Sequence, residues 1–455
     1  MERYDPSFRP RLPVGLIHRA RGTLHLLLHP HKPRWTVVNE TGYQVVGLCS
    51  IGCSVGEIVS FLSARYRRPA YSVHDDVLAF LGQLERAGFL GEEGGAGPSN
   101  GQPGLRRLTL YVTGRCNLRC RHCAVTPAMS QEDWLTLDDV RRLVDELAAM
   151  GGDRVIISGG EPLLREDVLE ILSYAAGRVK TLLSTNGTLI GERMAQALVE
   201  LGVSVQVSLD GATAATHDRI RGQGAFARAW QGIERLQRCG IGDRLALSVT
   251  VMRANVGECL DLIALAEERG VPAVRFFPLQ RVGRAAAAWD ELEVGADEQA
   301  WLYEELYLRL LRDGRSVAVD AGLPGFALHT SGEGRWCGLG RMLAVDATGD
   351  AYPCSLLMAP PFRLGNVREM NLGQLAASPR LREIVATCAG RTAQIAACRA
   401  CDWRNFCQGS CPASVWHRQG TWWATDDLCA LRQRLYEEAA FSTAMASKRH
   451  FAPSC

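Results

Sequence analysis

The stretch "TGRCNLRCRHC", Thr113–Cys123, places three cysteines in the spacing C-x3-C-x2-C. Thiolates are soft ligands that select zinc, copper or iron–sulfur clusters. Four of them close a tetrahedral zinc site or a [4Fe–4S] cluster. Three leave one iron of such a cluster open, so that a substrate with an amine and a carboxylate can chelate there. The stretch therefore predicts an iron–sulfur site held by Cys116, Cys120 and Cys123.

The three-cysteine stretch directly follows the first of six β-rich runs that alternate with amphipathic helical runs. This alternation predicts an α/β fold with a parallel sheet, curved into a partial (β/α)6 TIM-like barrel. Active groups of such barrels lie at the carboxyl ends of the strands, where the cysteines would then be. The predicted strands are Leu108–Thr113, Arg154–Ser158, Val179–Thr185, Ser204–Leu209, Leu245–Val251 and Ala273–Pro278.

The cysteine spacing and three further loops resemble the radical SAM superfamily. "SGGEP" (158–162), "STNG" (184–187) and "SLDG" (208–211) follow the second, third and fourth predicted strands. The resemblance implies that the three cysteines hold a [4Fe–4S] cluster that binds S-adenosylmethionine (SAM). An electron passed from the cluster would cleave SAM to a 5′-deoxyadenosyl radical, so the cofactor supplies the difficult chemistry.

The same resemblance implies which residues bind SAM. His122 takes a position that the superfamily usually gives to an aromatic residue, and Arg221 is placed to pair with the SAM carboxylate. The implied cofactor-binding residues are Gly159, Gly160, Glu161, Ser184, Asn186, Ser208, Asp210 and Arg221.

Seven further cysteines, apart from Cys388, lie in the range that begins with Cys337 and ends with Cys429. Their pattern resembles the SPASM extension of radical SAM enzymes, which carries two auxiliary [4Fe–4S] clusters. Two four-cysteine zinc sites fit the spacing equally well when it is considered alone, but the neighbouring radical SAM motif favours iron–sulfur. The resemblance implies one cluster on Cys398, Cys401, Cys407 and Cys429, and another on Cys337, Cys354 and Cys411.

The second set is one thiolate short of four. Some relatives place another cysteine before the glycine of this motif, but "GLGRMLAVDAT" (338–348) contains none. Either one iron stays open, where it could bind a substrate thiolate, or another side chain completes the site. The candidates for that ligand are Cys388, Asp346 and Asp350.

A Gly-, Pro- and Ser-rich stretch, "GEEGGAGPSNGQPG" (91–104), separates a small N-terminal domain from the rest of the chain. There "TLHLLL" and "RWTVVN" predict two strands, Ser54 and Glu57 predict a helix with a capping box, and Ser72 precedes another helix. These elements indicate a winged-helix module that binds DNA or peptide. Residues 1–95 hold 11 Lys and Arg against 9 Asp and Glu, which favours a peptide on a strand edge.

The N-terminal segment resembles the PqqD-type domain, which recognises the leader peptides of ribosomally made natural products. The residues on which this resemblance rests are "TVVNETGYQVVGLC", "SVGEIVSFLSARY" and "VHDDVLAFLGQLERAGFL". The expected layout is a PqqD-like winged-helix domain at 1–93, a flexible linker at 94–104, the radical SAM barrel at 105–320 and a SPASM domain at 321–455.

The 455 residues carry a net charge of only +2, which gives no indication of nucleic acid as a partner. No apolar run is long enough to span a membrane and the first residues lack a secretory signal, so we expect a cytoplasmic protein. The expected function is a radical SAM oxidoreductase that modifies a ribosomally synthesised precursor peptide by hydrogen abstraction and crosslinking. Its expected partners are the precursor, bound through its leader, and an electron donor such as flavodoxin or ferredoxin.

Other functions remain open at the level of sequence. A radical SAM enzyme with a SPASM domain could instead act on a tetrapyrrole or on a sulfatase-type protein. A non-catalytic iron–sulfur electron-transfer protein would produce no 5′-deoxyadenosine from SAM. A DNA-binding regulator is a further alternative, which the weak charge of residues 1–95 disfavours.

Overall fold

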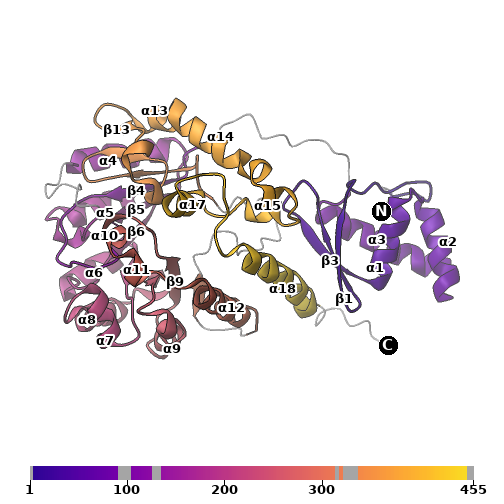
Figure 1. Cartoon of the computed structure of the whole chain (residues 1–455), viewed down its shortest axis with the longest axis horizontal. Coiled ribbons are helices and arrows are strands. Elements are labelled where there is room, and N and C mark those ends of the chain that lie inside the picture. The colour runs from indigo at the N-terminus through magenta and orange to yellow at the C-terminus, as the bar shows by residue number, and fades with distance from the viewer. Residues whose placement is uncertain (1–3, 91–103, 125–134, 313–316, 321–336, 448–455) are drawn as a thin grey trace.

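The computed structural model describes residues 4–90, 104–124, 135–312, 317–320 and 337–447 (Figure 1). An N-terminal domain lies at one end, a barrel at the other, and the cysteine-rich segment connects the two. Apart from Gly104, the predicted linker 94–104 lies outside the described residues. No helix in the described ranges is both long and apolar enough to cross a membrane.

The N-terminal domain is a three-stranded antiparallel sheet followed by three helices. Both predicted strands are present, but β1 was missed because most of its residues are exposed and polar. The sheet order is β1-β2-β3. The elements are β1 (Ile17–Arg21), β2 (Leu24–Leu28), β3 (Trp35–Asn39), α1 (Glu40–Ser50), α2 (Val55–Tyr66) and α3 (Ala70–Arg86).

The capping box of α2 is present: the Ser54 side chain accepts the Glu57 N–H, and Glu57 accepts the Ser54 N–H. The predicted start of the next helix at Ser72 is wrong. Helix α3 begins at Ala70, two residues earlier, with Pro69 as its N-cap and no side-chain hydrogen bond to cap it. The winged-helix assignment is not confirmed by this arrangement.

The six predicted strands of the barrel are all present and parallel. They are β4 (Arg107–Tyr111), β5 (Arg154–Ser158), β6 (Lys180–Thr185), β7 (Ser204–Ser208), β8 (Leu245–Val251) and β9 (Ala273–Pro278). The sheet does not end with them. β10 (Ala318–Asp320) pairs with β9, and β11 (Met342–Val345) of the cysteine-rich segment pairs in parallel with β4. β12 (Asp350–Tyr352) and β13 (Gly365–Asn366) then continue this sheet antiparallel.

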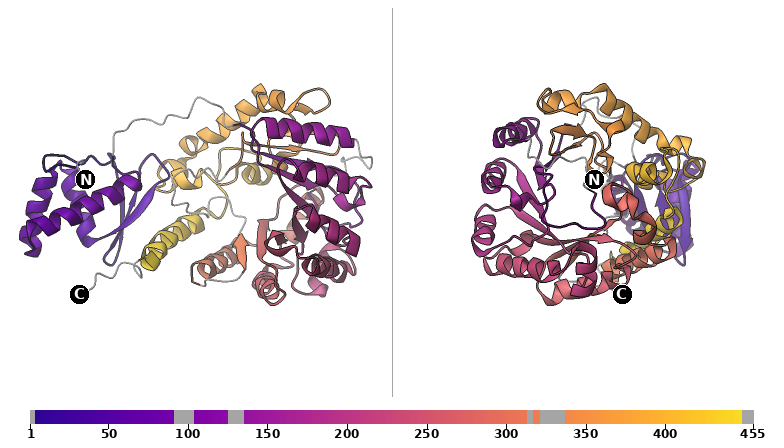
Figure 2. Two further views of the ribbon diagram at one scale, coloured as in Figure 1. Left: turned by 180° about the vertical axis from the view of Figure 1, so that it is seen from behind. Right: turned by 60° about the vertical axis from the view of Figure 1, so that its left-hand side comes forward.

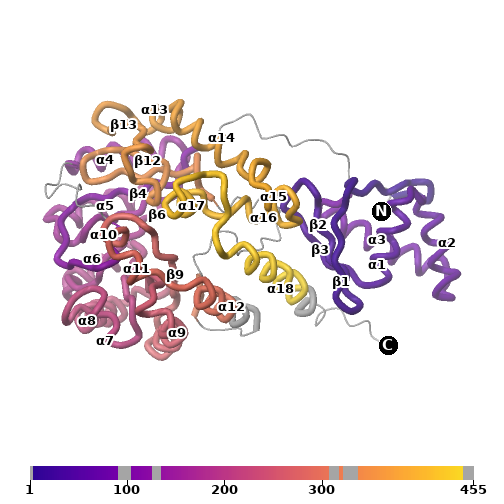
Figure 3. The backbone as a smooth tube through the Cα atoms, in the orientation of Figure 1, coloured from indigo at the N-terminus to yellow at the C-terminus, as the bar shows by residue number. Residues whose placement is uncertain are grey.

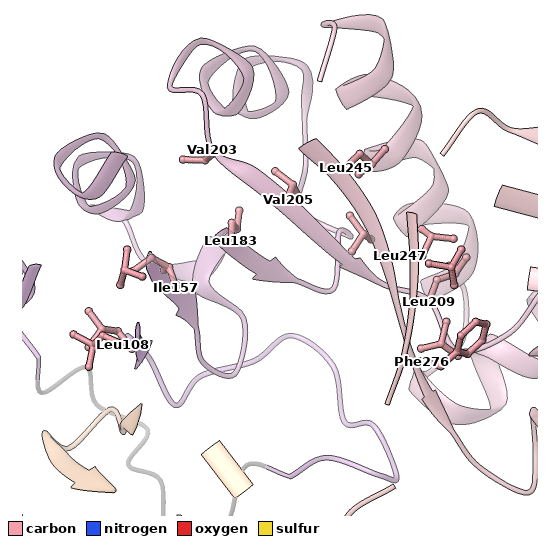
Figure 4. Close-up of a cluster of buried hydrophobic side chains, with 14 of the residues drawn as sticks. Leu108, Ile157, Leu183, Val203, Val205, Leu209, Leu245, Leu247 and Phe276 are labelled. Carbon is pink, nitrogen blue, oxygen red and sulfur yellow. The ribbon is translucent and has the colours of Figure 1, made fainter. Parts of the chain in front are cut away.

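Side chains alternate between the two faces of the barrel strands. Outward residues such as Leu183, Val205 and Leu247 are fully buried between the strands and the surrounding helices (Figure 4). Inward residues face the hollow of the curved sheet, which is seen end-on in Figure 2. The covering helices include α4 (Leu137–Ala149), α5 (Val168–Ala176), α6 (Glu192–Glu200), α7 (Ala214–Arg221), α8 (Ala225–Arg238) and α9 (Cys259–Glu268).

Beyond β9 lie α10 (Gly283–Ala287), α11 (Trp289–Leu292) and α12 (Ala296–Arg312). The cysteine-rich segment adds short helices to its strands. These are α13 (Leu372–Ala376), α14 (Pro379–Gln394), α15 (Ala396–Arg399), α16 (Arg404–Cys407), α17 (Pro412–Gln419) and α18 (Cys429–Ser447).

The N-terminal sheet packs directly on the cysteine-rich segment, beside α16 and α18 (Figure 3). Leu26 and Leu28 of β2 share one apolar cluster with Trp403, Phe406 and Tyr436. Burying such large side chains stabilises the contact by about 25 cal/mol per Å² of apolar surface. The two domains are therefore held together by an apolar core and not only by the connecting chain.

Candidate functional site

The three cysteines of the first motif line one cavity on the inner side of the barrel, with a volume of about 640 Å³. The same cavity is lined by the inward residues at the carboxyl ends of successive strands, including Ser158, Ser184, Ser208 and Thr250. Of the SAM-binding residues expected from the sequence, six line it: Gly159, Gly160, Ser184, Asn186, Ser208 and Arg221. Glu161 and Asp210 are fully buried behind its wall.

The glycine loop after β5 packs on the backbone of the cysteine loop. Gly160 donates its N–H to Thr113 O at 2.8 Å, and Glu161 donates to Arg115 O at 2.8 Å. A Cβ on Gly160 would lie 2.2 Å from Arg115 O, a distance no side chain tolerates. This glycine is therefore required for the two loops to meet.

The Glu161 carboxylate joins the loops that follow β5 and β6. It accepts the Thr185 hydroxyl at 2.7 Å and the N–H groups of Asn186 at 2.7 Å and Leu163 at 3.1 Å. Burial raises the pKa of Glu161, while these donors oppose the rise. Among the described residues, Glu161 therefore contacts the loops after β5 and β6 and holds them together from outside the cavity.

Asn117, which sequence reasoning missed, ties the loop after β6 to the cysteine loop. Asn186 donates from Nδ2 to Asn117 Oδ1 at 2.8 Å, and Asn117 donates from Nδ2 to Thr188 Oγ1 at 2.8 Å. A lone asparagine between two cysteines gives no signal of such a role.

A buried ion pair lies next to the cysteines. Arg221 donates to Asp210, reaches Cys120 Sγ at 3.9 Å and lies 3.5 Å from His122 Nε2. Burial would raise the pKa of Asp210, but the charge of Arg221 and the Thr250 N–H hold it below its usual value. Burial lowers the pKa of His122 to about 4, so this imidazole is neutral at pH 7.

A second arginine holds the cysteine loop from the far side of the barrel. Arg284 donates its backbone N–H to Cys123 O at 2.9 Å and its Nε to Cys120 O at 2.9 Å. A Cβ on Gly283 would lie 2.4 Å from Cys123 O. These residues were missed because about 160 residues separate them from the motif they support.

Three arginines, Arg107, Arg154 and Arg275, line the cavity toward the amino ends of the strands. Arg275 donates to Gln206 Oε1 at 2.9 Å. Within the described residues none of the three forms an ion pair. Guanidinium groups recognise carboxylates in a planar, two-pronged geometry, so this end of the cavity suits a substrate that carries carboxylates.

One set of C-terminal cysteines lines a second, smaller and more enclosed cavity. Two donors point at its thiols: Arg432 lies 3.9 Å from Cys407 Sγ, and Gln433 lies 3.7 Å from Cys429 Sγ. Such donors stabilise anionic sulfur around an iron–sulfur cluster. The four cysteines are those expected from the sequence: Cys398, Cys401, Cys407 and Cys429.

The other set lies on the barrel side. Cys354 and Cys411 pack on one apolar cluster with Tyr352, and burial, followed by the neighbouring thiols Cys411 and Cys337, raises the pKa of Cys354. In the described part of the chain no three donor side chains converge closely enough to hold a single metal ion. Tyr111 lines the barrel cavity together with Cys123 of the first motif and Cys411 of this set.

A curved parallel sheet with three thiols at its carboxyl end, above a cavity walled by glycine and serine loops, is the architecture of radical SAM enzymes. Comparison with known proteins supports this class. Residues 110–266 match the Radical SAM superfamily, residues 25–90 match "Coenzyme PQQ synthesis protein D (PqqD)", and residues 337–402 match an "Iron-sulfur cluster-binding domain" known as SPASM.

Mycofactocin maturase MftC of Mycobacterium ulcerans is 35% identical, over 68% of this chain and 83% of the relative. AdoMet-dependent heme synthase of Nitratidesulfovibrio vulgaris is 29% identical, over 74% of this chain and 95% of the relative. The structure of Streptococcus suis SuiB bound to S-adenosylmethionine covers 92% of this chain and 99% of its own, with a TM-score of 0.59 and 15% identity.

The chain belongs to the radical SAM superfamily, in the group of radical SAM/SPASM peptide maturases that carry an N-terminal PqqD-type domain. This family implies a SAM-binding [4Fe–4S] cluster and auxiliary clusters. The residues present fit these groups. Three thiols share one cavity beside the Arg221 guanidinium, and four more enclose a second cavity with two donors aimed at sulfur.

Proposed function

We propose that the protein matures a ribosomally synthesised precursor peptide, which it binds through the leader. The observation that carries this proposal is the PqqD-type domain packed on the cluster-bearing segment through Leu26, Leu28 and Trp403. A peptide added to an edge of the β1-β2-β3 sheet would be held beside the cysteine-rich segment. Mycofactocin maturase MftC, which is similar to this chain, supports a peptide substrate.

Cys116, Cys120 and Cys123 would hold the SAM cluster, and the loops after β5, β6 and β7 would bind SAM. When bound, the cluster supplies the electron that cleaves SAM to a 5′-deoxyadenosyl radical. The chain's own residues position the reactants. Arg221 offers a fixed cation for the SAM carboxylate, and Ser184 and Ser208 line the cavity where the cofactor would extend. The curved sheet walls this space on one side, which limits the access of solvent to a reactive radical.

The same proposal includes a cytoplasmic location and a protein that donates electrons. Every cysteine in the described ranges is a free thiol, which suits the reducing cytoplasm. A reductant of low potential must supply electrons, and a flavodoxin or ferredoxin is the class of protein that does this.

Mass spectrometry of a short peptide encoded beside this protein and co-expressed with it tests the proposal. Loss of two hydrogen atoms from the peptide would indicate a crosslink. Production of 5′-deoxyadenosine without any change in the peptide would reject the peptide as substrate.

A tetrapyrrole is the second candidate substrate. The three unpaired arginines in the cavity would suit the propionates of a porphyrin, and a heme synthase is among the relatives. Titration with an iron porphyrin that carries propionates distinguishes the two. The peptide proposal expects no shift of the porphyrin absorption bands.

A further inference from the structure

Cys337, Cys354 and Cys411 would supply ligands to three irons of a [4Fe–4S] cluster. A fourth protein ligand is needed if the remaining iron is not to bind substrate. Cys354 is the N-cap of the short helix η4 (Ser355–Leu357) and Cys411 is the N-cap of α17. Both thiols contact one apolar cluster of the cysteine-rich segment. Three thiolates leave one corner of a [4Fe–4S] cluster without a protein ligand.

Helix α14 runs along this site and contacts the chain next to two of its cysteines. A Cβ built on Gly340, three residues after Cys337, would lie 3.2 Å from a methyl group of Val385. Further along the same helix, Arg391 donates from Nη1 to the carbonyl oxygen of Ser410 at 3.0 Å. Ser410 is the residue directly before Cys411. Residues three apart on a helix share a face, so the side chain between these two contacts is that of Cys388.

The surroundings of Cys388 place it in the same site. It packs against the apolar cluster that also contains Cys354 and Cys411. Burial raises the pKa of Cys388 to about 12, Arg391 opposes the rise, and the charges of Cys337 and Cys411 add to it. Cys354, Cys388 and Cys411 thus pack on one apolar cluster, and Cys337 lies three residues before Gly340, which meets Val385 of α14.

The two aspartates that the sequence offered as alternatives are engaged elsewhere. Asp346 accepts the N–H groups of Thr348 at 2.9 Å and of Asp350 at 3.0 Å. Asp350 pairs with Arg363 at 2.8 Å. Both lie at the tip of the β11–β12 hairpin, and the four residues from Asp350 to Cys354 span roughly 13 Å of extended chain.

We propose that Cys388 is the fourth protein ligand of the cluster held by Cys337, Cys354 and Cys411. Ligation exchanges the thiol proton for iron and releases that proton to solvent. All four irons then have protein ligands, so this cluster carries electrons and leaves no iron for a substrate thiolate. The inference concerns the chain's own ligands and holds whether the substrate is a peptide or not.

The test compares protein variants reconstituted with iron and sulfide in the absence of oxygen. The parent is the triple variant Cys116→Ala, Cys120→Ala, Cys123→Ala, so that only auxiliary clusters contribute. Cys388→Ala and the better space-filling Cys388→Ser are made in it, with Cys239→Ala as the control outside the sites. Electron paramagnetic resonance (EPR) is recorded before and after addition of cyanide, a probe that binds an open iron.

The parent and the Cys239→Ala control should hold about 8 irons and show no cyanide effect. Cys388→Ala should either lose about 4 irons or give a changed EPR signal that cyanide shifts further. Cys388→Ser, which keeps the volume, should alter the signal of one cluster only. The proposal is overturned if both Cys388 variants keep the parent's iron content and spectrum. A cyanide shift in the parent, or opening of the site by Asp346→Asn, also overturns it.

Discussion

Arg221 donates from Nε to Asp210 Oδ2 at 2.5 Å, and the two side chains are 10% and 0% exposed. The second carboxylate oxygen of Asp210 accepts the Thr250 N–H at 2.8 Å. Asp210 therefore fixes the direction of the guanidinium from behind, and the same guanidinium reaches Cys120 Sγ. The pair links the ends of β7 and α7 to the cysteine loop, so the charge next to the cluster site is set by the barrel itself.

Asp210→Asn should destabilise the folded protein, because it leaves the buried Arg221 cation without its counter-charge. Breaking a buried pair in this way costs about 3–5 kcal/mol. Anaerobic denaturant unfolding of the reconstituted protein measures the change. The exposed Asp243→Asn serves as a control and should leave the free energy of unfolding unchanged. An Asp210→Asn variant as stable as the parent would show that the pair does not hold the fold.

Replacing Cys116, Cys120 or Cys123 by alanine should abolish SAM cleavage while the auxiliary clusters remain. Cys398, Cys401, Cys407 and Cys429 line a separate cavity, and Cys411 lines the barrel cavity but belongs to a different set of thiols, so the auxiliary clusters should assemble independently. Iron analysis should fall from about 12 to about 8 irons per chain. Loss of all iron in any of these variants would contradict separate sites, and an assay that finds only zinc would contradict the iron–sulfur assignment.

The strands and the cysteine sites could be predicted because their signals are local. The loops that carry Cys116–Cys123, Gly160 and Ser208 follow strands with clear apolar patterns, and all six strands were found within two residues of their bounds. The C-x2-C-x5-C-x3-C spacing of Cys398–Cys411 is likewise visible in the sequence without any knowledge of the fold.

Supports that come from distant parts of the chain could not be predicted. Arg284 reaches the cysteine loop from about 160 residues away, and its role exists only once the barrel has closed. β10 and β11 have only three or four residues, too few for a periodic pattern, and their pairing depends on the neighbouring sheet edge. Cys388 could be offered from the sequence only as one of three candidate ligands, because it lies outside every spacing motif, and it is the packing of α14 that favours it over Asp346 and Asp350.

Arg275→Met should slow product formation without slowing the SAM cleavage that occurs in the absence of substrate. Arg275 lines the cavity, donates to Gln206 and forms no ion pair among the described residues, although Asp320 lines the same cavity from the neighbouring strand, so its charge can still attract an anionic group of a substrate. Losing a charged hydrogen bond costs about 1.5–3 kcal/mol, which corresponds to roughly 10- to 100-fold. Separate assays of product and of 5′-deoxyadenosine measure this. The exposed Arg238→Met is the control, and equal loss of both activities would contradict a substrate role.

Acid should destabilise the protein through His217. Burial lowers the pKa of His217 to about 4, and its Nδ1 accepts the Asp210 N–H at 3.1 Å. The unfolded chain binds a proton near pH 6.5, whereas the folded chain resists it until about pH 4. The free energy of unfolding should therefore fall as the pH drops from 6.5 to 4, by on the order of 3 kcal/mol.

His217→Asn isolates this contribution, because asparagine keeps an acceptor near Nδ1 but does not titrate. Denaturant unfolding between pH 4 and 7 should show a shallower pH dependence in the variant. Parallel curves for the two proteins would mean that His217 does not contribute to the acid sensitivity.

Arg19→Glu should weaken the docking of the N-terminal domain. Arg19 of β1 pairs with Asp402 and with Glu437, both at 2.8 Å, so the substitution turns two attractions into repulsions across the contact. Exposed pairs contribute only about 0–1 kcal/mol each, and the apolar cluster beneath them keeps the fold intact. Peptide modification should slow several-fold, whereas SAM cleavage without peptide stays at the parent level, as separate product assays would show. Adding Glu437→Arg should restore part of the lost rate, because it recreates one attraction with reversed charges. A double variant as slow as Arg19→Glu alone would place the defect in β1 itself and not in the contact between the domains.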